Sequence, residues 1–293
     1  MILLRIAFFL SLLNYLSTGN TARLDRLSGY DINKPYSVSV LPENLVEISG
    51  ITSIDSVTIA LVQDESGTIF VYDTRKKQLV TQMPFAGPGD YEGIAKLDRK
   101  YFVLRSDGLL YEISDFQSNK PVVRVLDTKL PAKDNEGLCY DPVSRNLILA
   151  CKEGYEFEDV KNKQLVYSYE PISGKLSEKP ILILDIKAIR KLIKENKIKV
   201  PGIEKDKLDD LKFRTSDIGF NPVTGKYYLL AASDYLMLVV DRSGKIDNIV
   251  PLDRDIFRKA EGITFNSRGD MFISNEGDGK QATILRFRYH GMP

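Results

Sequence analysis

The chain has 293 residues, of which 43% are hydrophobic and 28% are charged, and its formal net charge is +1. This composition is typical of a globular protein, and the near-neutral charge provides no field that would recruit nucleic acid or an acidic membrane. The only histidine, His290, lies close to the C-terminus, which argues against Ser-His-Asp, Cys-His and poly-histidine metal sites.

Residues 1–19 have the layout of a secretory signal peptide, with a basic start, an apolar stretch over Ile6–Leu16 and small residues at Ser17–Gly19. The apolar stretch is shorter than the roughly 20 residues of a membrane-spanning helix. We therefore predict cleavage at the end of this segment, with an uncleaved membrane anchor as the alternative. An exported protein of the periplasm or cell envelope is expected, with a linker over 20–35 and a single domain over 36–293.

A short string recurs five times after this segment, as Ser or Glu, then Gly or Asp, then Ile or Leu, then a small residue. Its copies begin at Ser49, Glu92, Glu136, Ser216 and Glu261. Each copy starts a unit of short strands, rich in Ile, Val, Tyr and Phe, that are separated by turns containing Gly, Asp or Asn. Four antiparallel strands in roughly 40–45 residues is the period of a propeller blade. The sequence therefore predicts an all-β fold, a five-bladed β-propeller.

The two ends of the repeat array indicate how the ring closes. The last unit ends with a third strand over Thr283–Tyr289, and the chain then stops before a fourth. Tyr36–Leu41 is a spare strand ahead of the first repeat. We expect this strand to complete the last blade and close the ring. A separate edge strand is the alternative.

The longest interval between repeats contains an irregular insert at about 185–213. Apolar residues at 186, 189, 192 and 193 have helical spacing, and most of the other residues of this helix are Lys or Arg. Such a helix either packs its apolar stripe on the flank of the propeller or contacts a membrane or a partner protein. A sixth, degenerate blade over 155–213 is the alternative to an insert.

The two cysteines, Cys139 and Cys151, flank the turn at 143–146 of one hairpin. A register in which paired residue numbers sum to 290 would place them opposite each other, and export would favour a disulfide. A change of register by one residue would instead leave two small buried thiols. Both outcomes stay open at this point.

The innermost strand of each blade should line the central channel, so the first residues of the repeats and the loops after the second strands should meet at one rim. Acids at equal positions around a ring repel each other unless a cation offsets their charge, and oxygen ligands suit Ca²⁺. We therefore predict a calcium site at the rim. Its candidate ligands are Glu47, Glu92, Glu136, Asp217 and Glu261. The remaining candidate rim residues are Asp64, Arg105, Lys152, Asp234, Asn275 and Glu276.

Two other roles for these acids stay open. They could form hydrogen bonds between blades or pair with Arg105 and Lys152, or two of them could form a catalytic pair. The Gly that follows most of the acids would let the strands approach closely near the axis, with Asp217 as the exception.

The strings LVEISGIT, GDYEGIA, DNEGLCYDP, TSDIGFNP and KAEGITFNSRGDMFISNE resemble the SdiA-regulated (YjiK-like) family of bacterial envelope propellers. The resemblance covers roughly residues 36–290. It implies an exported propeller associated with the cell envelope, calcium binding, and no established biochemical activity. Glu92, Glu136 and Glu261 match the Glu-Gly blade starts of the family, and Ser49 and Ser216-Asp217 match its Ser-containing ones.

The first functional hypothesis is a non-enzymatic envelope module that holds Ca²⁺ at its acidic rim and recognises an unknown ligand or envelope protein. It would be a monomer, with peripheral membrane association as an option and no nucleic-acid partner. The alternative is a calcium-dependent hydrolase of lactones or phosphoesters, with a rim carboxylate as base. A third hypothesis is a structural partner protein that uses the basic helix at 186–199 as its contact.

Overall fold

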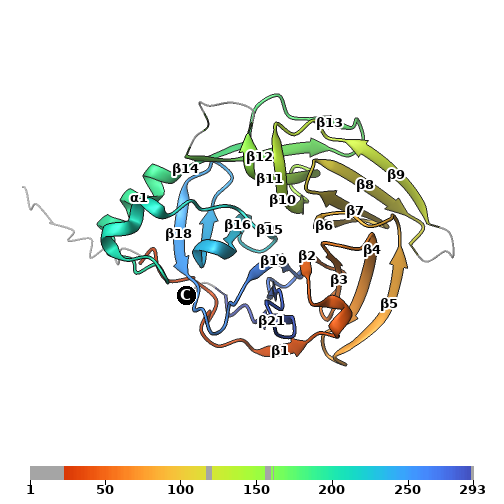
Figure 1. The fold of residues 1–293 in the computed structure, drawn as a ribbon, viewed down its shortest axis with the longest axis horizontal. Coiled ribbons are helices and arrows are strands. Elements are labelled where there is room, and N and C mark those ends of the chain that lie inside the picture. Colours follow the sequence, from red (N-terminus) through yellow and green to blue (C-terminus); the bar gives the residue numbers. More distant parts are fainter. Residues whose placement is uncertain (1–22, 117–120, 156–159, 161, 292–293) are drawn as a thin grey trace, which may run out of the picture.

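Five antiparallel sheets stand around a central axis as the blades of a closed ring (Figure 1). The computed structural model describes residues 23–116, 121–155, 160 and 162–291. The predicted signal peptide lies outside the described residues. The innermost strands β2, β6, β10, β15 and β19 surround the axis, and each contacts the innermost strand of the next blade.

The strands of each blade follow one another from the axis outwards. Blade 1 comprises β2 (Ile48–Ser53), β3 (Thr58–Gln63), β4 (Thr68–Asp73) and β5 (Gln78–Pro84). Blade 2 comprises β6 (Tyr91–Leu97), β7 (Lys100–Arg105), β8 (Leu109–Ser114) and β9 (Val122–Asp127). Blade 3 comprises β10 (Ala132–Asp141), β11 (Asn146–Tyr155), β12 (Lys163–Glu170), β13 (Lys175–Leu176) and β14 (Leu182–Asp185). Blade 4 comprises β15 (Asp217–Asn221), β16 (Lys226–Ala231), β17 (Leu236–Val240) and β18 (Ile246–Pro251). Blade 5 comprises β19 (Ala260–Phe265), β20 (Met271–Asn275), β21 (Thr283–Phe287) and β1 (Ser37–Val40).

The prediction of a five-bladed propeller is confirmed, and the alternative of a sixth blade over 155–213 is wrong. Both β13 and β14 pair with β12, so this part of the chain extends the outer edge of blade 3. The described residues that follow β14, up to residue 213, form helical segments and loops and no further strand.

The N-terminal strand closes the ring as the sequence predicted. β1 pairs antiparallel with β21, from Ser37 opposite Arg286 to Val40 opposite Thr283. Backbone hydrogen bonds extend the ladder by one residue at each end, since the Leu41 amide donates to the Ala282 carbonyl at 2.9 Å and Tyr36 to Arg286 at 2.7 Å. The first and last parts of the domain are therefore joined in one sheet.

Glycines allow the inner strands to approach each other, as predicted. A Cβ at Gly50 would lie 2.5 Å from the carbonyl oxygen of Glu92 in the next blade. A Cβ at Gly262 would lie 2.6 Å from the carbonyl oxygen of Ser49. Such distances exclude any side chain, so these positions need glycine for the closeness of the neighbouring backbone.

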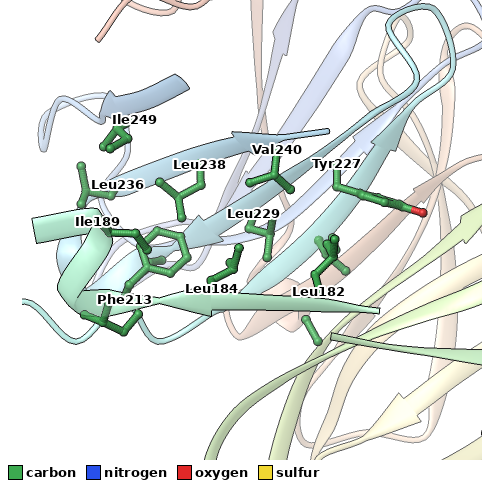
Figure 2. Packing of buried hydrophobic residues seen from close by; sticks show 14 of the residues in the cluster. Leu182, Leu184, Ile189, Phe213, Tyr227, Leu229, Leu236, Leu238, Val240 and Ile249 are labelled. Carbon is green, nitrogen blue, oxygen red and sulfur yellow. The ribbon is translucent and has the colours of Figure 1, made fainter. Parts of the chain in front are cut away.

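The helical insert packs against the outside of blades 3 and 4. α1 (Ile186–Glu195) begins at Asp185, whose Oδ1 accepts a hydrogen bond from the Lys187 amide at 2.8 Å. Its apolar stripe is buried in a cluster that includes Leu184 of β14 and Phe213 (Figure 2). The interpretation that the helix docks on the flank of the propeller is confirmed.

The other helical segments within the described ranges are short 3-10 helices, the longest of which is kinked at Lys207. They are η1 (Glu43–Leu45), η3 (Lys205–Asp210) and η4 (Ala232–Asp234). Across the part of the chain that the structure describes, no helix has both the length and the apolar character needed to cross a membrane.

The predicted alternative of a disulfide is wrong, and both cysteines are free. Asp141 pairs with Asn146, so the paired residue numbers next to the turn sum to 287 instead of 290. Two bulges near Asn135 adjust the register further, and Cys139 lies opposite Ile148 while Cys151 lies opposite Asn135. The two thiols therefore sit at separate positions of blade 3.

Candidate functional site

Three glutamates occupy the same repeat position on three inner strands, near one mouth of the channel. They are Glu92 on β6, Glu136 on β10 and Glu261 on β19. Burial raises the pKa of all three, and the charge of Glu261 raises the pKa of both Glu92 and Glu136 further. The pKa of Glu92 reaches about 8. These carboxylates are therefore within electrostatic reach of one another, as the repeat positions imply.

Their direct partners differ from blade to blade. The Ser49 hydroxyl lies 2.8 Å from Oε2 of Glu92 and donates to it. Lys152 donates to Oε1 of Glu136. Lys259 lies 3.7 Å from Oε1 of Glu261. The ion pair between Lys152 and Glu136 is the neutralising contact that the sequence offered as an alternative to a cation.

Lys259 is a site residue that the sequence reasoning missed. Its ammonium group donates to Oε2 of Glu276, next to Glu261, so one lysine serves two acids from the same blade. The signal was present in the sequence, because Lys259 stands two residues before Glu261. Together Lys152 and Lys259 reduce the negative charge of this mouth.

Asp217 has a different role from the three glutamates. It occupies the glycine position of blade 4 and is 1% exposed. Its Oδ1 accepts from the amides of Ile218 at 2.8 Å and Leu138 at 3.2 Å, and its Oδ2 accepts from Ile263 at 2.7 Å. These donors belong to the inner strands of three adjacent blades. Both oxygens are thus used for hydrogen bonding between blades, and Asp217 is not available as a ligand in this arrangement.

Among the buried side-chain atoms that have no hydrogen-bond partner within the described residues, five are carboxylate or amide oxygens in or next to the predicted rim positions. They belong to carboxylate or amide groups of four blades: Asp64 Oδ1, Asn135 Oδ1, Glu136 Oε2, Asp234 Oδ2 and Asn275 Oδ1. A buried acceptor without a donor is unfavourable by about 1–3 kcal/mol, and such atoms are rare in folded proteins. Each of these oxygens could still accept a hydrogen bond or contact a cation.

Hydrogen bonds from the side-chain amide nitrogens to backbone carbonyls orient Asn135 and Asn275. Nδ2 of Asn135 donates to the carbonyls of Ser106 and Ala132, both at 2.9 Å. Nδ2 of Asn275 donates to the carbonyl of Ile256 at 2.9 Å. These bonds fix the orientation of both amide groups, and each side-chain oxygen then has no hydrogen-bond donor among the described residues. Asn135, directly before Glu136, was not predicted as a site residue.

The other predicted rim residues lie around this group. Burial raises the pKa of Asp64 to about 6, and the charges of Glu47 and Glu65 add to the shift. Asp234 accepts from the Lys212 amide at 3.4 Å. Arg105 pairs with Asp107 at 2.7 Å, so it does not neutralise a channel glutamate.

A calcium ion fits this mouth in chemistry but not in the observed geometry. Carboxylate and amide oxygens are the ligands that Ca²⁺ prefers, and Glu136 Oε2 is buried without a donor. Over the described residues, however, no three His, Cys, Asp or Glu side chains form a group that could hold a metal ion. The ammonium groups of Lys152 and Lys259 instead form ion pairs with Glu136 and Glu276. A cation at the rim would have to compete with these lysines.

The opposite mouth of the channel has another character. A hollow of about 170 Å³ lies there, lined by the later residues of the same inner strands, including Ile94, Leu138 and Phe220. Cys139 also lines it. The acidic cluster is therefore confined to the mouth where the inner strands begin.

Comparisons with solved structures show the same architecture at low sequence identity. The structure of Myxococcus xanthus glutaminyl cyclase aligns with a TM-score of 0.57 and 13% identity, over 87% of this chain and 95% of that one. The structure of a luciferin-regenerating enzyme aligns with a TM-score of 0.51 and 11% identity, over 88% of this chain and 97% of that one. At these identities the similarity concerns the fold alone. The comparison with curated proteins gives no significant match. The sequence matches the family described as SdiA-regulated over residues 36–278, which span nearly the whole propeller, and the chain therefore belongs to the SdiA-regulated family.

Proposed function

We propose that this protein is an exported propeller of the cell envelope that binds a cationic partner at its acidic rim, with Ca²⁺ as the first candidate. It acts as a monomeric binding module for a ligand or an envelope protein, with no nucleic-acid partner, and peripheral attachment to a membrane is compatible with this role. The export part of the proposal is supported by the sequence of residues 1–19.

The observation that carries the proposal is the environment of Glu136. Its side chain is 6% exposed, Oε1 accepts from Lys152, and Oε2 has no donor among the described residues. Burial and the charge of Glu92 raise its pKa. A second positive group near Oε2 would satisfy the free oxygen and offset the repulsion between the glutamates.

A calcium titration of the purified, calcium-free protein by calorimetry tests the proposal. Wild type should release or absorb heat, and its melting temperature should rise with calcium, since a ligand at 100 times its Kd adds about 2.7 kcal/mol of stability. Glu136→Gln should weaken the affinity at least about tenfold, which corresponds to ~1.4 kcal/mol. The exposed Glu178 provides the matched control, and Glu178→Gln should behave like wild type. Absence of heat and of a melting shift in wild type would show that the acids are structural.

The hydrolase alternative has one observation in its favour. Glu92 has a pKa of about 8, and a carboxyl group that titrates near neutral pH can act as a general acid or base. Turnover of a panel of lactones and phosphoesters, with calcium and with a chelator, separates the two functions. The binding proposal expects no turnover in either condition, whereas calcium-dependent turnover that is lost in Glu92→Gln would replace it.

Export is tested by mass spectrometry of the protein made in cells. The signal-peptide proposal expects a mature N-terminus within a few residues of Asn20. An intact Met1 on protein recovered from the membrane fraction would instead identify an uncleaved anchor.

A further inference from the structure

A groove lies on the outer flank of the propeller, remote from the channel. It runs between the end of α1 and residues 197–208, and its volume is about 720 Å³. Figure 1 shows α1 outside the ring, beside β14 and β18. The groove therefore belongs to the insert and is independent of the acidic rim.

The floor of the groove is apolar. It is formed by Ile193, Ile198, Val200, Ile203 and Leu208. The first three of these side chains are buried in the core cluster of blades 3 and 4, and the last two are partly buried against the same cluster. The floor is thus recessed behind the surface of the protein.

Backbone hydrogen bonds hold the wall of the groove in place. The Ile198 amide donates to the Ile193 carbonyl at 3.0 Å, which ties the chain after α1 to the helix. The Ile203 amide donates to the Val200 carbonyl at 3.3 Å, around a turn in which Gly202 has a φ of 79°. The groove is therefore formed before any ligand arrives, which reduces the entropic cost of binding.

The edge of the groove carries an excess of positive charge. Four exposed lysines line it: Lys194, Lys197, Lys199 and Lys205. Within the described ranges none of the four forms an ion pair. Two acids, Glu204 and Asp206, also line the groove, and Glu204 pairs with Lys207 at 3.3 Å. The lysines are thus left to attract an anion.

We infer that this groove binds an anionic amphiphile with a single acyl chain, of the fatty-acid class. The chain would lie on the apolar floor, and the carboxylate would lie among the lysines at the edge. A recessed apolar floor cannot enter a bilayer, so the shape favours a single bound molecule over contact with a membrane surface. Flexible lysines recognise a compact anion as point charges, which fits a carboxylate head group.

Calorimetric titration with laurate, kept below its critical micelle concentration, tests the inference. Wild type should bind one laurate, and the affinity should fall as salt is added. Lys197→Glu together with Lys199→Glu should weaken binding about tenfold or more, since two attractive charges become repulsive. The exposed Lys175 lies on β13, away from the groove, and Lys175→Glu is the matched control. Ile203→Asp should also abolish binding by placing a charge on the floor.

Dodecyltrimethylammonium, which has the same chain length and the opposite charge, is the matched ligand and should not bind in the groove. Equal affinity for laurate in the Lys197/Lys199 double variant and in wild type would overturn the inference. So would retention on vesicles of anionic phospholipid without any 1:1 binding of laurate, because the surface would then contact a membrane. If Ile203→Asp does not fold, as judged by circular dichroism, the double variant decides, since it changes only exposed side chains.

Discussion

Two buried carboxylates at neighbouring blade starts, Asp217 in blade 4 and Glu136 in blade 3, have opposite surroundings. Asp217 accepts hydrogen bonds from three backbone amides, one in its own blade and one in each neighbouring blade. Glu136 accepts a hydrogen bond only from Lys152, and its second oxygen has no donor in the described part of the chain. Glu136 lies at the first position of its repeat string and Asp217 at the second position of the next one.

The difference separates a structural acid from a candidate binding acid. A buried acid whose oxygens are all hydrogen-bonded by fixed backbone groups stabilises the fold, and a ligand could only disrupt it. A buried charge that is partly satisfied, and only by a flexible lysine, retains capacity for another positive group. The number of hydrogen bonds accepted, more than the presence of an acid in the repeat, therefore distinguishes the two roles.

The largest loss of stability is expected when the ring is opened by removing β1, because ring closure brings Asp217 and Glu136 to their partners. Removing residues 1–46 deletes β1 and the buried Leu41 and Leu45, and should reduce the free energy of unfolding by more than about 5 kcal/mol or prevent folding. Thermal unfolding measures this. Removal of residues 1–35, which leaves β1 in place, is the control and should have a smaller effect. An unchanged melting temperature after the longer truncation would contradict closure by β1.

Asp217→Ala should have the next largest effect, about 3–5 kcal/mol, because three backbone amides near the axis lose their acceptor. Urea unfolding of Asp217→Ala and of Glu136→Gln, both without calcium, tests the comparison directly. Glu136→Gln should change stability by less than about 1 kcal/mol, since the carboxylate it replaces is poorly satisfied. Similar losses in both variants would remove the distinction between the two acids.

Lys152→Met should destabilise the calcium-free protein by about 2 kcal/mol, because it leaves the Glu136 carboxylate buried without a positive partner. If a cation and Lys152 compete for this carboxylate, calcium should restore more stability to Lys152→Met than to wild type. Thermal unfolding with and without calcium measures both effects. Adding Glu136→Gln to Lys152→Met should recover the lost stability, and failure to do so would show that the lysine acts through packing alone.

The smallest effect concerns pH. Burial raises the pKa of Glu92 to about 8 in the folded protein, well above the usual value of a glutamate, 4.5. The folded state therefore binds more protons than the unfolded state between these values, and stability should fall as pH rises through this window. Glu92→Gln should reduce the decline between about pH 5 and pH 8 by on the order of 1–2 kcal/mol, which allows for screening by solvent. Urea unfolding at several pH values in the presence of a chelator measures the slope, and an identical slope in Glu92→Gln would refute the shift.

Much of the fold was predictable because each blade of a propeller repeats the same sequence pattern. The five strings marked the inner strands, and the missing fourth strand of the last unit identified Tyr36–Leu41 as the closing strand. The register of the cysteine hairpin could not be predicted, because it depends on where Asp141 and Asn146 close the turn and on bulges near Asn135.

The sequence alone indicated five blades and the strand that closes the ring, and it predicted that the repeat acids lie near one mouth, because equal positions in a repeat map onto one circle around the axis. Only the tertiary structure decided what each acid does there. Asp217 meets backbone amides that lie far away in the sequence, and Glu136 and Glu261 meet lysines whose reach depends on how neighbouring strands pack. Periodicity fixes where a side chain starts, whereas burial and the partners within hydrogen-bonding distance of its end decide its charge, its pKa and its capacity to bind.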